Sequence, residues 1–128
     1  MSDTTTIELT TIVDTHLAAY GEPDPVRRSE LIARVWATDG ALVDPPLDAR
    51  GHGAISDMCA AVQAHVPGHP FRRTSGVDAH HDVARYEWEL VDAEGSCALT
   101  GLDVATVGAD GKLVLVTGFL GALPTREH

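Results

Sequence analysis

The sequence lacks a long apolar run, a signal-peptide pattern and an excess of positive charge. No apolar stretch in its 128 residues reaches the length of a membrane-spanning helix. Met1 to Thr6 has neither the basic start nor the apolar centre of a signal peptide, so we expect a cytoplasmic protein. Lys and Arg total 9 against 19 Asp and Glu, a net charge of −10. That balance argues against nucleic acids and anionic membranes as partners.

Cysteine is scarce, and neither the two cysteines nor the adjacent histidines form a metal-binding pattern. Cys59 and Cys97 lie far apart without a C-x-x-C spacing, so we expect buried free thiols rather than a disulfide or a metal pair. His80 and His81 are adjacent, and adjacent residues of a strand point to opposite faces. Neither of these two histidines is part of an H-x-x-x-H or H-x-H pattern. We therefore predict no metal site and no cofactor.

Repeats, low-complexity tracts and linkers are absent as well. With 44% apolar residues, a chain of this length can bury one proper core. We expect a single domain over residues 1–128, with its core at about 7–121 and frayed ends.

Two stretches show simple helical periodicity. The apolar positions of Ile7 to Tyr20 fall on one helical face, and His16 lies on the same face. The stretch from about Ala54 to Val66 has a similar apolar stripe, with His65 on its border. A histidine in such a position is either a satisfied core residue or a functional group that faces inward.

A further helix is predicted after Asp24-Pro25, which supplies a capping carboxylate followed by a proline at the first helical position. Its buried stripe ends at Trp36. We expect Arg27, Arg28 and Arg34 on this helix to face water.

The remaining segments indicate strands. A turn at Thr38 to Gly40 precedes a short strand at Ala41 to Asp44, which Pro45-Pro46 stops. Leu47 to Arg50 returns as a second short strand. Phe71 to Ala79 is a polar, partly exposed strand, followed by a turn at His80 to Asp82.

The last two strand regions are longer. Val83 to Val91 alternates cleanly and places Tyr86, Trp88 and Leu90 on one side. Ser96 to Gly121 predicts two strands joined by the glycine-containing loop at 108–111. Both faces of this hairpin are mostly apolar, so we expect helices against one face and a second layer or subunit against the other.

The predicted order of elements is α-α-β-β-α-β-β-β-β. It indicates an α+β fold in which a curved antiparallel sheet wraps around three helices. Such a sheet forms a cone, and the open mouth of a cone is a natural small-molecule pocket.

Two carboxylates are the candidate catalytic groups. Asp44 ends a strand before two prolines and can act as a general base or activate a water, or it can simply accept a backbone N–H at the turn. Asp103 is the sole carboxylate in the strands of the last hairpin. If buried and unpaired it is neutral and donates a hydrogen bond, and the alternative is a pair with Arg50 or Arg73.

Aromatic side chains are the candidates for the wall of the pocket. Tyr86 and Trp88, together with Leu90 and Phe119, can line it and contact a substrate. The alternative for Tyr86 and Trp88 is a plain core role.

Several local phrases resemble the SnoaL-like domains of the nuclear transport factor 2-like superfamily. They are W-A-T-D-G-A-L-V-D-P at 36–45, G-H-G-A-I at 51–55, G-L-D-V at 101–104, D-G-K-L at 110–113 and Gly118-Phe119. The resemblance covers roughly residues 8 to 121. It implies the cone-shaped, cystatin-like fold. The superfamily includes isomerases, cyclases, hydrolases and non-catalytic binders, so the fold leaves the function open.

A more distant similarity connects the chain with ketosteroid isomerase. It implies that Asp44 is the general base and that Asp103 is a protonated hydrogen-bond donor. The tyrosine that the isomerase carries on its first helix corresponds to His16, and Tyr20, one turn later, can take its place.

The interpretation is a cofactor-independent small-molecule enzyme, an isomerase, cyclase or hydrolase. The catalytic candidates are Asp44, Asp103 and His16. The substrate-binding candidates are Tyr20, His65, Tyr86, Trp88 and Phe119. We expect a small apolar or carbonyl-bearing ligand, and a homodimer formed through the outer face of the sheet. The alternative is a non-catalytic ligand-binding or dimerisation module of the same fold.

Overall fold

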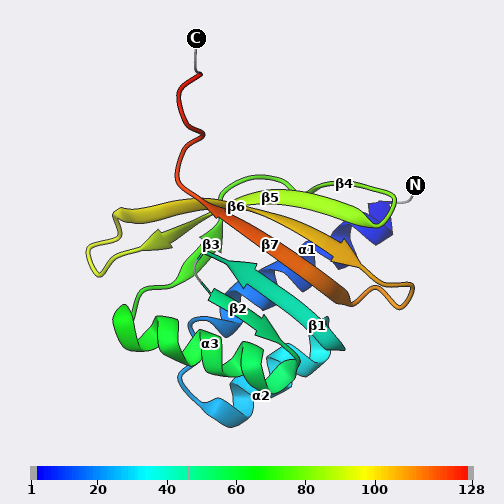
Figure 1. Cartoon of the computed structure of the whole chain (residues 1–128), viewed down its shortest axis with the longest axis horizontal. Helices are drawn as coiled ribbons and strands as arrows, with labels where there is room; N and C mark the ends of the chain where they lie inside the picture. Colours follow the sequence, from blue (N-terminus) through cyan, green and yellow to red (C-terminus); the bar gives the residue numbers. More distant parts are fainter. Residues whose placement is uncertain (1–2, 46, 127–128) are drawn as a thin grey trace.

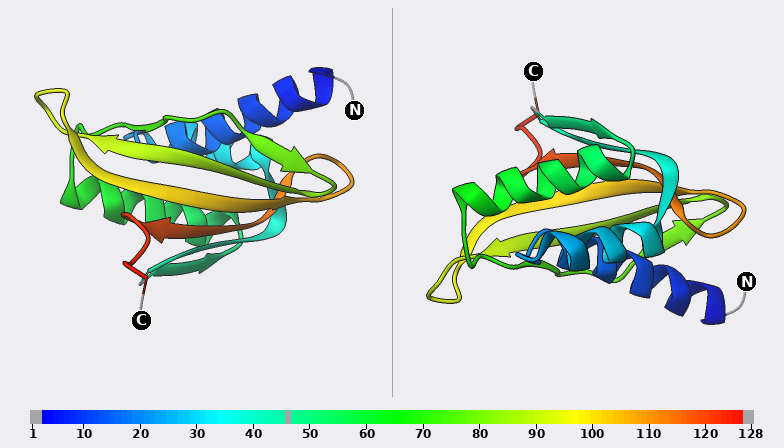
Figure 2. Two further views of the ribbon diagram at one scale, coloured as in Figure 1. Left: turned by 90° about the horizontal axis from the view of Figure 1, so that it is seen from above. Right: turned by 90° about the horizontal axis from the view of Figure 1, so that it is seen from below.

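Three helices cover one face of a curved sheet in the computed structural model, which describes residues 3–45 and 47–126 (Figure 1). The helices are α1 (Asp3–Ala19), α2 (Pro25–Val35) and α3 (His52–His65). The strands are β1 (Trp36–Asp44), β2 (Leu47–Arg50), β3 (Phe71–Arg73), β4 (Asp78–His80), β5 (Val83–Val91), β6 (Cys97–Val107) and β7 (Leu113–Leu120). Seen from below, the helices lie in front of the strands, so none of the helices in the described residues covers the other face of the sheet (Figure 2).

The strand order is β2-β1-β7-β6-β5-β3, and β4 also pairs with β5. The predicted α+β class, with a curved sheet around three helices, is confirmed. One detail of the prediction was wrong, because β1 and β7 pair in parallel and the sheet is mixed. These two strands are separated by most of the chain, so no hairpin fixes their relative direction.

The start of β1 differs from the prediction. Trp36 was assigned to the stripe of α2, and Thr38 to Gly40 to a turn. Trp36 instead caps α2 with an extended backbone (φ −106°, ψ 138°), and the strand runs from it without a break to Asp44. The register of β1 with β7 shifts between Trp36 and Ala41. The polar residues Thr38 and Asp39 therefore occupy an irregular part of the strand.

The segment before β5 also differs from the prediction. Phe71 to Ala79 was expected as one strand, but it forms β3 and β4, two short strands that pair with opposite halves of β5. His80 ends β4, while His81 and Asp82 form the turn. His81 has a φ of 54°, the left-handed value that tight turns require.

Arg28 was expected to face water and is buried. Its side chain is 7% exposed. It donates to Ser56 Oγ at 3.0 Å and to the carbonyl of Glu22 at 2.8 Å. The helical pattern did not show that α2 lies between α1 and α3. Because of this position, Arg28 of α2 binds Ser56 of α3.

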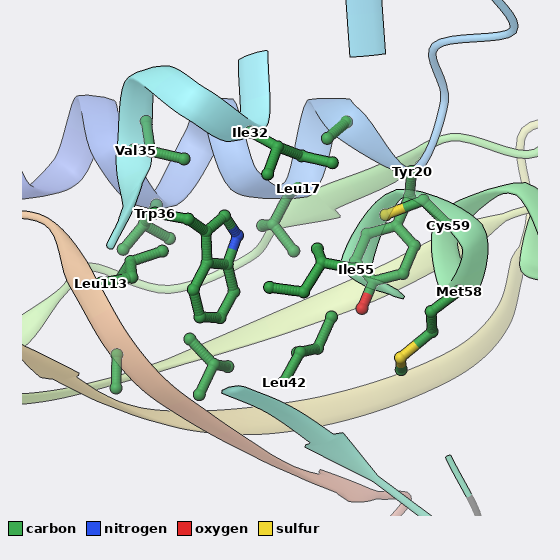
Figure 3. Close-up of a cluster of buried hydrophobic side chains, with 14 of the residues drawn as sticks. Leu17, Tyr20, Ile32, Val35, Trp36, Leu42, Ile55, Met58, Cys59 and Leu113 are labelled. Atoms are coloured by element: carbon green, nitrogen blue, oxygen red, sulfur yellow. The ribbon is translucent and has the colours of Figure 1, made fainter. Parts of the chain in front are cut away.

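The core lies between the helices and the inner face of the sheet. Figure 3 shows Trp36, Val35 and Leu113 at one end of a buried cluster and Tyr20 and Met58 at the other. Trp36, Ile32 and Leu113 are fully buried. Among the described residues, no helix combines the length and the apolar character that crossing a membrane requires.

The outer face of the sheet carries exposed apolar side chains. Val104 is 37% exposed, Leu115 39% and Phe119 57%. Three such residues on neighbouring strands are consistent with an interface. The homodimer expected through this face stays a prediction.

Candidate functional site

A cavity of about 210 Å³ opens at the end of the core where Tyr20 lies. Its deep wall consists of buried side chains, namely Leu17, Tyr20, Trp88, Leu90 and Asp103. Its rim consists of exposed ones, namely Pro45, Leu47, His65, Leu99 and Leu120. Asp44, Val62, Val66 and Phe71 complete the lining between rim and wall. Nearly all of this surface is aliphatic or aromatic, so the two carboxylates are the exception that needs an explanation.

Three adjacent strands bring the two carboxylates together. Asp103 of β6 lies opposite Gly118 of β7. On the other side of β7, Val43 of β1 pairs with Thr117, which places Asp44 beside Gly118. Side chains at matching positions of neighbouring strands point to the same face. Asp44 and Asp103 therefore both face the helices, with the glycine between them.

Gly118 leaves the space in which the carboxylates approach each other. A Cβ on Gly118 would overlap Asp44 Oδ1 and stand 3.0 Å from Asp103 Oδ1. The added Cβ would lie closer to Asp44 Oδ1 than to Asp103 Oδ1. The distance between the two oxygens is therefore less than twice 3.0 Å. A glycine within a strand often marks a close approach of this kind.

Asp103 is held by two aromatic donors. The hydroxyl of Tyr86 donates to its Oδ2 at 2.9 Å, and the indole Nε1–H of Trp88 donates to its Oδ1 at 2.9 Å. The alternative pairing of Asp103 with Arg50 or Arg73 was wrong. Arg73 binds both oxygens of Asp14, and Arg50 donates to the carbonyl of Asp39.

The protonation of Asp103 reflects opposing effects. Burial raises its pKa to about 6, the hydrogen bonds from Trp88 and Tyr86 lower it, and the charge of Asp44 raises it. Both donors stabilise the ionised carboxylate. Sequence reasoning expected a neutral Asp103 if it were unpaired. Paired as it is, a group with this pKa is mainly ionised at neutral pH.

Asp44 is less satisfied than Asp103. Its Oδ1 is buried and has no hydrogen-bond partner. Burial raises its pKa, and a hydrogen bond from the side chain of Tyr20 lowers it. The alternative role at the Pro45-Pro46 turn involves Pro46, which lies outside the described residues. An oxygen that is buried without a partner is costly unless a ligand uses it.

The structure brings most of the predicted site residues to one place. Tyr20, His65 and Trp88 line the cavity with both carboxylates. Tyr86 does not line it and contacts Asp103 from behind. Phe119 lies on the outer face instead, where it lines a separate depression together with the C-terminal segment at 121–123.

His16 lies outside the cavity lining. Its ring packs edge-on against Tyr20 and Trp36, with centroid distances of 5.5 and 5.4 Å. Burial lowers its pKa to about 4, so it is neutral at physiological pH. Tyr20, one turn later on the chain, lies beside Asp44. Burial raises the pKa of this phenol, which keeps it a proton donor.

Sequence reasoning missed two features of the site. One is the function of Gly118, for which a glycine inside an apolar strand was the available signal. The other is the polar function of Tyr86 and Trp88, which were expected as apolar walls or plain core. Their alternation showed that they share a face, but only the register Tyr86–Asp103 and Trp88–Gly101 brings them to the carboxylate. Among the residues that the structure describes, no group of three or more His, Cys, Asp or Glu is arranged to hold a metal ion.

Comparison with protein-family models gives no match, and comparison with curated proteins gives none either. Solved structures do resemble the chain. A proposed isomerase of the SnoaL-like family from Agrobacterium tumefaciens superposes with a TM-score of 0.85 and 32% identity, covering 91% of this chain and 99% of that one. A proposed polyketide cyclase from Sinorhizobium meliloti gives a TM-score of 0.69 and 16% identity, covering 89% and 98%.

A protein of unknown function with a cystatin-like fold, from Methylobium petroleophilum, gives a TM-score of 0.74 at 12% identity, covering 94% of this chain and 80% of that one. At such low identity the second and third likenesses concern the fold alone. The Agrobacterium structure is different, because its identity extends over almost the full length of both chains. The resemblance seen in the sequence is thereby confirmed, and the chain belongs to the SnoaL-like family.

Proposed function

We propose that the protein is a cofactor-independent enzyme in which Asp44 moves a proton to or from a small, mostly apolar substrate. The observation that carries the proposal is the buried, unpartnered Oδ1 of Asp44 at the wall of an apolar cavity. A poorly solvated carboxylate is a stronger base than one in water, because burial raises its pKa. The similarity to a proposed isomerase supports proton transfer as the reaction type.

The neighbouring groups fit defined roles around that base. Tyr20 lies beside Asp44, and hydrogen bonding from its hydroxyl lowers the pKa of that carboxyl. Asp103 is fixed by Tyr86 and Trp88 and sets the electrostatic potential next to Asp44. His16 receives no role in this scheme, since Tyr20 occupies the position beside the base.

Hydrogen exchange tests the proposal without knowledge of the natural substrate. The purified protein is incubated in D₂O with a panel of small cyclic ketones, each with and without an amino substituent. Deuterium entry next to the carbonyl is followed by NMR. We expect exchange of at least one compound to be faster than in buffer, and Asp44→Asn to slow it about 100-fold or more.

Two further variants separate chemistry from folding. Asp48→Asn removes an exposed carboxylate of β2 opposite Val43 and is expected to leave exchange unchanged. Gly118→Ala keeps both carboxylates but puts a methyl group where Asp44 Oδ1 lies, so it is expected to slow exchange in a folded protein. Exchange by Asp44→Asn at the wild-type rate would contradict the proposal. Binding of the compounds with no exchange at all would favour the non-catalytic binding module.

A further inference from the structure

The polar groups at the depth of this mostly apolar cavity are hydrogen-bond acceptors without a free donor beside them. Tyr20, Trp88 and His65 are the described lining residues whose side chains carry polar hydrogens. The Trp88 N–H is used by Asp103, and the Tyr20 hydroxyl is used by Asp44. His65 lies at the exposed rim. A ligand that placed its carbonyl oxygen at the depth of the cavity would therefore meet carboxylate oxygens instead of donors.

Both carboxylates have room for another donor. An ionised carboxylate oxygen can accept more than one hydrogen bond. Asp103 Oδ1 accepts one from Trp88, and Asp44 Oδ1 accepts none although it is buried. These two oxygens face each other across Gly118, so an N–H group placed between them would find two acceptors.

The described part of the cavity lining offers this pair no lysine or arginine. Two carboxylates in a poorly solvated place repel each other, and a cation between them stabilises both.

The cavity also has an aromatic wall. The rings of Tyr20 and Phe71 lie 4.6 Å apart and those of Phe71 and Trp88 lie 5.3 Å apart, centroid to centroid. All three line the cavity. Aromatic rings attract cations through their electron-rich faces, and proteins use rings in this way to bind ammonium groups.

From these features we infer that the cavity binds a small organic ammonium ion, with its N–H groups between Asp44 and Asp103 and its hydrocarbon part against the aromatic and aliphatic wall. This inference rests on the proposed function in so far as it names the substrate class of the same site. A cavity of roughly 150 Å³ can hold benzene, so the 210 Å³ here suits one ring with a short substituent.

Three probes of similar size and different charge test the inference. Benzylammonium, benzyl alcohol and benzoate are titrated into the protein near neutral pH, and heat release and Trp fluorescence report binding. We expect benzylammonium to bind at least about tenfold more tightly than benzyl alcohol, a difference of ~1.4 kcal/mol. Benzoate is expected to bind most weakly. Equal or tighter binding of benzyl alcohol, or no binding of benzylammonium at millimolar concentration, would overturn the inference.

Variants locate the binding within the molecule. Asp44→Asn is expected to reduce the preference for the ammonium probe at least about fivefold, while Asp48→Asn keeps it, and circular dichroism checks that each variant is folded. A preference that survives in folded Asp44→Asn would place the ammonium elsewhere and overturn the inference. If Asp44→Asn does not fold, the comparison of probes on the wild type decides.

The two proposals fail in different ways. Ammonium preference without hydrogen exchange in any ketone would support this inference and contradict the proposed function. Hydrogen exchange that depends on Asp44, without a preference for the ammonium probe, would support the proposed function and contradict this inference.

Discussion

The two ends of the space between helices and sheet are built differently. At the closed end, around Trp36, side chains fill the volume and the polar groups are neutral: His16 is buried with a lowered pKa, and its Nε2 has no partner. At the open end, around Tyr20, a cavity remains, and two carboxylates line it. Both ends contain buried polar atoms without partners, but the one at the open end belongs to a residue that lines a cavity.

The difference shows how one core serves both stability and function. Trp36, Ile32 and Leu113 at the closed end are fully buried, so the unpartnered atoms there are a cost of folding. At the open end the lack of a side chain on Gly118 allows a close approach of acids that a folded core would otherwise avoid. The comparison predicts that substitutions at the closed end change stability, and that substitutions at the open end mainly change the chemistry of the carboxylates.

The largest effect is expected for Trp36→Ala at the closed end. The indole is fully buried, and its removal leaves a cavity that the neighbours fill only partly. We expect the free energy of unfolding to fall by about 4 kcal/mol, measured by urea denaturation. Trp36→Phe, which keeps part of the volume, should cost clearly less. A loss below about 2 kcal/mol for Trp36→Ala would show that the closed end is not the better packed one.

The next effect concerns His16 and pH. Its pKa is lowered from 6.5 to about 4 in the folded protein. As pH falls below 6.5 the unfolded chain binds a proton there while the folded protein does not, so stability is lost down to about pH 4. The stability of the wild type relative to His16→Leu should therefore decrease by about 3 kcal/mol across this window.

The comparison with the variant matters because Asp103 acts in the opposite direction. Its folded pKa is raised from 3.8 to about 6, so falling pH favours the folded state through this group over a similar range. The difference between wild type and His16→Leu isolates the histidine. A difference that does not change with pH would mean that His16 is protonated in the folded protein or reached by water.

Local patterns predicted the fold well because most elements are defined by nearby residues. The Asp24-Pro25 start of α2 is one example, since Asp24 caps the helix by accepting from the N–H of Val26. The β6–β7 hairpin is another, with Gly111 at φ 83° in its turn. The parallel pairing of β1 with β7 was not predictable in this way, because it depends on packing between distant parts of the chain.

The site was predictable only in its residue types. A strand-end Asp44 and an apolar-strand Asp103 were identifiable from the sequence. Their approach across Gly118 depends on the register of three strands, and a change of one residue would turn a side chain to the other face. The same limit applies to Tyr86 and Trp88, whose hydrogen bonds to Asp103 are a consequence of register.

A moderate effect is expected for Tyr86→Phe, which tests the carboxylate at the open end. The change removes the donor to Asp103 Oδ2 and leaves a buried acceptor, so the free energy of unfolding should fall by about 2 kcal/mol at neutral pH. Because that hydrogen bond lowers the pKa of Asp103, the pKa should rise above about 6 in the variant. An NMR titration of the side-chain carboxyl carbons measures this, with the Asp103→Asn spectrum assigning the signal. An unchanged pKa would mean that Trp88 alone holds the carboxylate.

The smallest effect is expected for Leu120→Ala, and one strand supplies its control. Leu120 is at the rim of the cavity and 44% exposed, whereas Leu113, at the other end of β7, is fully buried beside Trp36. Loss of a half-exposed leucine should lower the free energy of unfolding by about 1 kcal/mol, and Leu113→Ala should lower it by about 3 kcal/mol. Urea denaturation of both variants measures the two losses of unfolding free energy, which can then be compared. Equal losses would mean that the rim is covered in solution, and the contrast between a closed and an open end would then have to be abandoned.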